Sequence, residues 1–182
     1  LAQLRPVVAN RLLHGIGAHR LAAHPGIEMF ARAGASAASR CGMQTKAYDW
    51  VFLAHDAAVA MGRWPRALDA LYAYEDGALH SFQRARRAGL QCIWDLPLPH
   101  WRSIQTLFED ESKRWPDAAG AVPIEPAWKR MRKEQELGIA TGISVASAFT
   151  RSSLEAVGVR QPIVTVPYGF PVEKKKKKKE RP

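Results

Sequence analysis

Residues 67–94 read ALDALYAYEDGALHSFQRARRAGLQCIW, and this stretch decides the fold. Two apolar runs, Ala67–Tyr74 and Leu90–Trp94, enclose a segment of a different pattern. The enclosed segment repeats apolar side chains at helical spacing: Leu79, Phe82 and Ala85. It closes with two arginines and Gly89, which is a typical helix end. A strand, a helix and a second strand in this order indicate a parallel sheet, because parallel strands need a crossover connection.

The same alternation of apolar runs and helical segments continues to residue 166. Two further apolar runs cover Gly142–Ala146 and Ile163–Val166. The helical segments between the runs are marked by large apolar side chains: Trp101, Ile104, Leu107 and Phe108, then Trp128, Met131 and Leu137, then Phe149, Leu154 and Val157. The runs are almost continuously apolar, as in strands that are covered on both faces. The sequence therefore predicts an α/β fold, a Rossmann-like three-layer sandwich with a mainly parallel sheet.

The residues before this alternation have the pattern of helices and loops. The strongest helical signal covers residues 45–61, where apolar side chains recur on one face. His55 falls on that face, where a packing role is favoured over a catalytic one. We therefore divide the chain into a helical N-terminal part over 1–66, a Rossmann-like domain over 67–172 and a lysine-rich tail over 173–182.

Composition and charge narrow the class of protein. Hydrophobic residues make up 47% of the 182 residues, which suits a globular domain. No apolar run approaches the roughly 20 residues that cross a bilayer. The first residues lack the pattern of a signal peptide, and two cysteines indicate no disulfide framework, so we expect a cytoplasmic setting. Half of the net charge of +10 comes from residues 173–182, where the run Lys174–Lys179 predicts disorder.

Candidate site residues follow from the rule that ligands of open parallel sheets bind beyond the carboxyl ends of the strands. The polar and turn residues at those ends are Glu75 and Asp76, then Asp95 with His100 and Trp101 after it, then Ser147, then Tyr168 and Gly169. Most of them have a structural alternative. His100 either contacts a ligand or is simply an N-terminal residue of its helix. Glu75 and Asp76 either bind hydroxyl groups or complement a helix dipole. Ser147 either contacts a ligand or caps a helix, and Trp94 and Trp101 either stack on a sugar ring or pack in the core.

Several standard motifs are missing from the sequence. It contains no Gly-rich phosphate loop of either common kind, no Cys or His spacing for zinc, and no Gly-x-Ser-x-Gly elbow. Residue patterns by themselves therefore indicate an α/β domain with an acidic crevice.

Three stretches carry a more specific resemblance. They are Leu68–Leu79, Leu90–Pro97 and a long segment made of Glu134–Ala140, Ile143–Leu154 and Val164–Gly169. The long segment resembles a pattern of Glu-x-x-hydrophobic, Ala-Asp, strand, Ser-x-Phe-x-x-x-x-Leu and Val-x-Val-Pro-x-Gly. Together the stretches resemble the N-terminal domain of the retaining GT-B glycosyltransferases of family four, the group one type.

The chain also departs from that family pattern. The Ala-Asp pair is Ala140-Thr141 here, and Trp94-Asp95 stands where many members carry a histidine. The family's N-terminal glycine-rich strand and its second domain, which binds the sugar nucleotide, have no counterpart in the sequence. A truncated or frameshifted reading frame is the simplest account of the passage from Phe170-Pro171-Val172 into the lysine run. On this basis we expect the chain alone to lack transferase activity.

The resemblance implies a function and assigns roles to the candidate residues. It implies the acceptor-binding half of an enzyme that transfers a sugar from a nucleotide sugar to an acceptor hydroxyl with retention, without a cofactor or an obligatory metal. The roles it implies are catalysis for Asp95, acceptor binding for Glu75, Asp76, His100, Trp101 and Ser147, and an interdomain position for Tyr168 and Gly169. The expected partners are the nucleotide sugar and the acceptor, with peripheral membrane association and self-association as further expectations and no specific nucleic acid. The alternative is a non-enzymatic α/β binding module that its basic tail tethers to polyanions.

Overall fold

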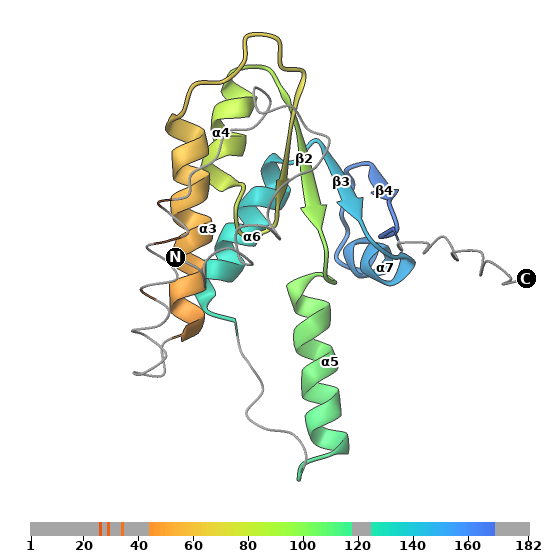
Figure 1. The fold of residues 1–182 in the computed structure, drawn as a ribbon. Coiled ribbons are helices and arrows are strands. Elements are labelled where there is room, and N and C mark those ends of the chain that lie inside the picture. Colours follow the sequence, from red (N-terminus) through yellow and green to blue (C-terminus); the bar gives the residue numbers. More distant parts are fainter. Residues whose placement is uncertain (1–25, 27–28, 30–33, 35–43, 118–124, 170–182) are drawn as a thin grey trace, which may run out of the picture. The chain divides into compact units, whose positions relative to one another are not determined.

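A computed structural model describes residues 26, 29, 34, 44–117 and 125–169 of the chain (Figure 1). The expected lysine-rich tail over 173–182 therefore lies outside the described residues. The chain divides into two compact units, Leu1–Val51 and Phe52–Pro182. This boundary lies inside helix α3 (Gln44–Met61), whereas the sequence suggested a division after residue 66.

The described residues of the second unit form four strands and, besides part of α3, four helices. The strands are β1 (Ala70–Tyr74), β2 (Gln91–Leu96), β3 (Gly142–Val145) and β4 (Ile163–Thr165). The helices are α4 (Leu79–Arg87), α5 (Trp101–Arg114), α6 (Ala127–Ile139) and α7 (Ala148–Ala156). All neighbouring strands are parallel and follow the order β1-β2-β3-β4. The predicted α/β, Rossmann-like fold with a parallel sheet is confirmed.

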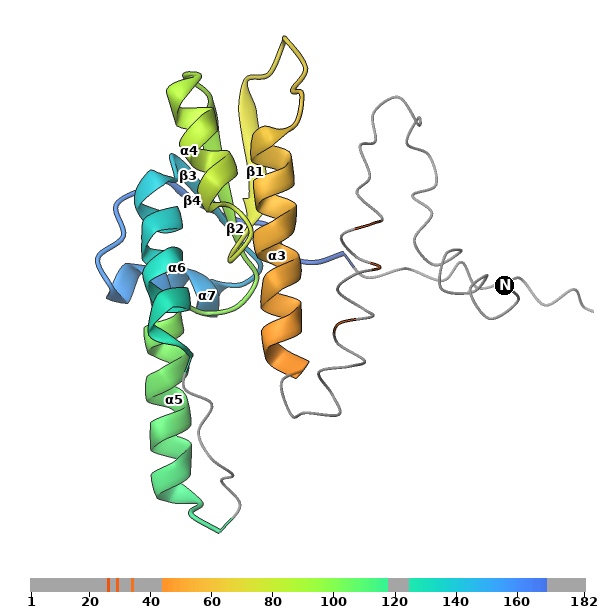
Figure 2. The same cartoon turned by 90° about the vertical axis from the view of Figure 1, so that its left-hand side faces the viewer.

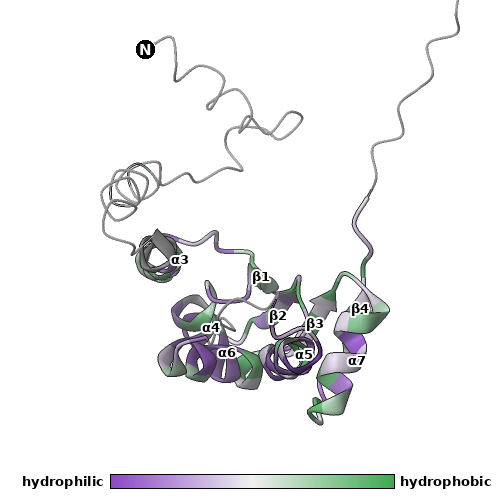
Figure 3. Cartoon of the chain, turned by 90° about the horizontal axis from the view of Figure 1, so that it is seen from below, coloured by the Kyte–Doolittle hydropathy of each residue, from purple (hydrophilic) through white to green (hydrophobic). Residues whose placement is uncertain are grey.

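Helices α4, α6 and α7 pack on one face of the sheet (Figure 3). Crossover connections between consecutive parallel strands are right-handed, so a sheet in sequential order places all its crossover helices on the same side. Helix α5 leaves the carboxyl end of β2 and extends away from the sheet (Figures 1 and 2). The helical layer expected on the other face is not among the described elements of this unit.

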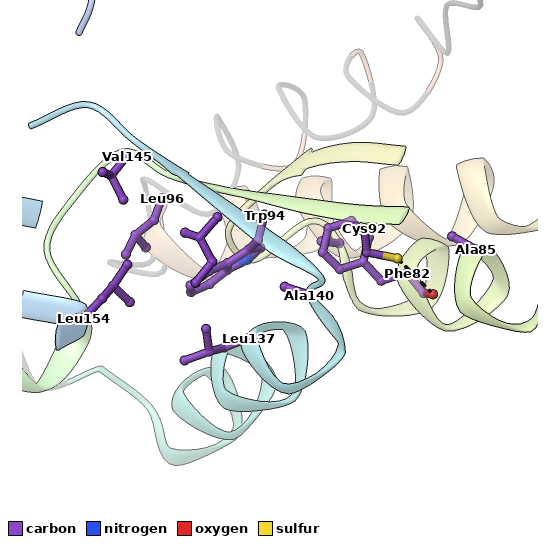
Figure 4. Close-up of a cluster of buried hydrophobic side chains, with 11 residues drawn as sticks. Phe82, Ala85, Cys92, Trp94, Leu96, Leu137, Ala140, Val145 and Leu154 are labelled. Carbon is purple, nitrogen blue, oxygen red and sulfur yellow. Dashed lines mark hydrogen bonds between the residues drawn. The ribbon is translucent and has the colours of Figure 1, made fainter. Parts of the chain in front are cut away.

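The core lies between the sheet and its helices (Figure 4). Trp94 of β2 is fully buried there, so its packing alternative holds and it is not available to stack on a ligand. Cys92 is also buried, and its Sγ atom lies 3.7 Å from the carbonyl oxygen of Phe82. Burial raises the pKa of the Cys92 thiol, which makes it a packing residue and not a nucleophile.

Two helices end at glycines with a left-handed backbone. Gly89 follows α4 with φ +77°, as the arginine-glycine pattern predicted, and Gly158 follows α7 with φ +78°. No described helix is long and apolar enough to cross a membrane.

Gly158 and Gly138 offer a matched pair of substitutions with opposite expected effects. Gly158→Ala should lower the free energy of unfolding by about 1 kcal/mol, because an L residue is strained at positive φ. Gly138→Ala should raise it by about 0.5 kcal/mol, because Gly138 is helical and an added Cβ meets nothing within 4 Å. Urea denaturation measures both, and two changes of the same sign would contradict the backbone geometry.

Candidate functional site

The end of β1 carries a compact cluster of acids and lysines. The Nζ atom of Lys133, on α6, lies 3.2 Å from Glu75 Oε1 and 2.7 Å from Glu125 Oε1. The Nζ atom of Lys129, one helical turn earlier, lies 3.1 Å from Asp76 Oδ2. We call these five residues the carboxylate–lysine cluster. It places two of the predicted acceptor residues, Glu75 and Asp76, at the carboxyl edge of the sheet.

Burial controls the ionisation of this cluster. It raises the pKa of Glu75 to about 7, although Lys133 acts in the opposite direction. Burial also raises the pKa of Asp76, against the attraction of Lys133 and Lys129. For Lys133, burial acts to lower the pKa, but the neighbouring carboxylates outweigh it and the pKa rises. Near neutral pH the cluster therefore holds both a carboxyl that titrates and a lysine that stays charged.

Asp76 shows two signs of a functional position. Its backbone is left-handed, with φ 69°, which is uncommon for a residue other than glycine. Its Oδ1 atom is buried and accepts no hydrogen bond within the described residues, and the same holds for Oε2 of Glu125. Buried oxygens without a donor are rare in folded proteins, so these two atoms are candidate acceptors for ligand hydroxyl groups.

The N-terminus of α4 is closed by two carboxylates from other helices. Glu136 accepts from the backbone amides of Asp76, Ala78 and Leu79 at 2.9–3.1 Å. Asp56 accepts from the amides of His80 and Ser81, at 2.8 and 2.9 Å.

The guanidinium of Arg132 joins these two acids, with its Nε atom 3.1 Å from Glu136 Oε1 and its Nη2 atom on Asp56. Burial acts to raise the pKa of Asp56, but its hydrogen bonds with Ser81, His80 and Arg132 outweigh burial and lower it. The anion site that a helix N-terminus normally offers is thus filled by internal carboxylates.

Two further helix N-termini at the same edge are closed by side chains. His100 caps α5 by accepting from the amide of Arg102, and its own amide donates to Ser153 at 2.9 Å. Ser147 caps α7 through the amide of Thr150, at 3.1 Å. Burial lowers the pKa of His100, which keeps the imidazole neutral. The capping alternative therefore accounts for both residues, and α4, α5 and α7 leave no open terminus for a phosphate group.

Asp95 does not share a crevice with Glu75, contrary to the sequence expectation. Asp95 pairs in register with Tyr74, so the two side chains lie on the same face of the sheet. Glu75 is the next residue and points to the opposite face, where it meets Lys133. The two residues are neighbours through the backbone, since the Glu75 amide donates to the Asp95 carbonyl at 3.1 Å. The alternation of side chains along a strand separates the carboxylates, and a catalytic role for Asp95 stays a prediction.

The remaining predicted residues lie apart from the carboxylate–lysine cluster. Trp101 donates from Nε1 to Glu134 at 2.9 Å, and the guanidinium carbons of Arg102 and Arg130 lie 5.0 and 5.1 Å from its ring centre. These contacts occupy the Trp101 ring with protein groups. Tyr168 is 70% exposed and Gly169 is also exposed, so the structure leaves their interdomain role open as a prediction.

The residues that the sequence reasoning missed are charged and lie on one side of α6. They are Lys129, Arg132, Lys133 and Glu136, together with Asp56 and Glu125 from outside the helix. Their spacing of three and four residues was a usable signal, because it marks one helix face. Apolar periodicity does not reveal this face, because it is charged and nevertheless largely buried.

Neither a metal-binding group nor a similar known protein points to a function for this site. In the parts of the chain that the structure describes, no group of three His, Cys, Asp or Glu side chains is arranged to hold a metal ion. No family model, no curated protein and no solved structure matches the chain.

Proposed function

We propose that the chain is the acceptor-binding half of a glycosyltransferase that transfers a sugar from a nucleotide sugar to an acceptor hydroxyl with retention. The observation that carries this proposal is the pair of buried oxygens, Asp76 Oδ1 and Glu125 Oε2, which lack a donor within the described residues. They lie at the carboxyl edge of a parallel sheet, where ligands of such sheets bind. Carboxylate oxygens are strong acceptors for sugar hydroxyl groups.

Two lysines bind the other oxygen of each of these acids. Lys129 and Lys133 pair with the opposite oxygens, Asp76 Oδ2 and Glu125 Oε1, and leave the other oxygen of each acid uncovered. The cluster can therefore orient an acceptor by two charge-assisted hydrogen bonds. Each bond of this kind contributes roughly 1.5–3 kcal/mol.

The closed helix termini favour the acceptor side of such an enzyme over the donor side. A nucleotide sugar carries a diphosphate, which α/β proteins commonly bind at a free helix N-terminus. Here Glu136 and Asp56 fill the terminus of α4, and side chains cap α5 and α7. Under this proposal the donor binds to a second domain, and the charge on its leaving phosphate is stabilised there.

The test combines a glycan array with a nucleotide titration of the purified chain. We expect glycan binding that Asp76→Asn weakens by about 10- to 100-fold, the range for one charge-assisted bond. Asparagine tolerates the left-handed backbone at position 76, so the loss would report the charge and not the fold. The control is Asp110→Asn, an exposed acid on α5 that should leave binding unchanged.

Two results would contradict the proposal. One is equal glycan binding by the Asp76→Asn variant and the unmodified chain, or no binding by either. The other is saturable binding of UDP-glucose or GDP-mannose at micromolar concentration, because side chains occupy the N-termini of α4, α5 and α7.

A further inference from the structure

Among the described residues of the second unit, one face of the sheet carries no packed helix; we call it the open face. On this open face the strands present the side chains of Ala70, Tyr72, Tyr74, Gln91, Ile93, Asp95, Ser144 and Val164. Helices α4, α6 and α7 all pack on the other face (Figure 3). Tyr72 and Tyr74 are 55% and 57% exposed, and Val164 is 60% exposed. Parallel sheets are normally covered on both faces, whereas the described residues place a layer on one face only.

The exposed side chains of the open face are of the kinds found at the centres of protein interfaces. Its one ionisable acid, Asp95, is buried, and it raises the pKa of the Tyr72 phenol by hydrogen bond and by charge, in addition to the effect of burial. The hydroxyl of Tyr72 also lies 3.5 Å from Ser144 Oγ. The rings of Tyr72 and Tyr74 meet edge to face, with their centres 6.3 Å apart. Exposed aromatic rings together with a depletion of exposed charge distinguish the centres of protein interfaces.

We propose that the open face of the sheet is an interface between two copies of this chain, related by a two-fold axis. A two-fold interface brings the same patch from both copies together, so the patch must complement itself. A face with no exposed charge meets that condition, because a second copy brings no like charges against it. Two sheets then pack face to face, as in other two-layered sheet structures.

The area of the face sets the strength of the pairing. A fully covered aromatic side chain buries roughly 150–250 Å², so the exposed halves of Tyr72 and Tyr74 offer roughly 200 Å² together. Val164 and the neighbouring Val166, which is 55% exposed, add to this apolar surface. Four short strands cannot reach the standard of about 800 Å² per partner, so the dimer belongs with the weak, reversible complexes. It should form at micromolar concentration and dissociate on dilution.

Sedimentation velocity across about 1 to 100 µM tests the proposal in the range of weak dimers. We expect the unmodified chain to move from monomer to dimer over this range. Tyr72→Lys and, separately, Val164→Lys should each weaken association at least about tenfold, since each places a charge among the exposed apolar side chains of the face. Met131→Lys is the matched control, because Met131 is 63% exposed on α6 and α6 packs on the opposite face.

Three results would overturn the proposal. A chain that stays monomeric to the highest concentration excludes the dimer, and so does a dimer that neither open-face variant weakens. The third is protection of Tyr72 and Tyr74 from tetranitromethane in the dilute monomer, which would show that another part of the same chain covers the face. Thermal melting by circular dichroism checks that each lysine variant folds, and the second variant keeps the test decisive if one does not.

Discussion

Glu136→Gln is expected to lower the free energy of unfolding by about 3–5 kcal/mol, the loss typical of breaking a buried ion pair. Glu136 is fully buried, and its two oxygens accept from three backbone amides and from Trp94 Nε1 at 3.2 Å. A glutamine retains one oxygen and turns an NH2 group toward these donors. It also leaves the buried guanidinium of Arg132 with one carboxylate fewer. Small domains are stable by only about 5–15 kcal/mol, so the variant should be partly unfolded at moderate temperature.

Glu134→Gln provides the control on the same helix, two residues earlier. The side chain of Glu134 is 39% exposed and pairs with Arg102 at 3.4 Å. Exposed pairs of this kind contribute at most about 1 kcal/mol, so the control should lose no more than that. Urea denaturation of both variants measures the difference. Equal losses would show that Glu136 does not hold the N-terminus of α4 in place.

The elements of the fold could be predicted because their signals are local. The runs Leu90–Trp94 and Gly142–Ala146 became β2 and β3, and the arginines before Gly89 ended α4 as expected. Apolar strands and helix caps depend on neighbouring residues, which a sequence displays directly. The apolar run Ala67–Tyr74 predicted the start of β1 three residues too early, because the strand begins at Ala70.

The arrangement of the site could be predicted only in part. Position along the chain placed Glu75, Asp76 and Asp95 at one edge of the sheet, but the face on which each side chain lies depends on a register that changes with a shift of one residue. The partners of Glu75 and Asp76 come from α6, more than fifty residues away, and local patterns do not reveal such pairs. The one-sided covering of the sheet was also missed, because a continuously apolar strand suggests two covered faces.

The stability of the chain should fall as the pH rises from about 4.5 to about 7, through the titration of Glu75. Its folded pKa is about 7, against an ordinary value of 4.5. Between these values the folded state binds more protons than the unfolded state, and stability therefore decreases with rising pH. Below 4.5 the stabilising contribution is complete, and above 7 it is lost. A difference of this size corresponds to roughly 3 kcal/mol.

Glu75→Gln should remove this dependence. A neutral amide cannot become a buried charge, so the variant should match the unmodified chain near pH 4 and exceed its stability at pH 8 by up to about 3 kcal/mol. The gain should fall short of that value, because Lys133 loses one of its carboxylate partners. Urea denaturation across this pH range is the appropriate measurement, since guanidinium salt would screen the charges. Glu155→Gln, an exposed acid paired with Arg151 on α7, serves as the control and should leave the pH dependence unchanged.

The same variant separates a structural role for Glu75 from a functional one. A charge that destabilises the fold at neutral pH is typical of a group that serves a site, because such sites sacrifice stability for activity. If Glu75 supports acceptor binding, Glu75→Gln should be more stable at pH 8 and yet bind glycans more weakly. Higher stability with unchanged glycan binding would place Glu75 outside the site and leave Asp76 and Glu125 as its acids. If Glu75→Gln is no more stable than the unmodified chain at pH 8, Lys133 fully compensates the buried charge of Glu75. The pKa of Glu75 would then lie well below 7.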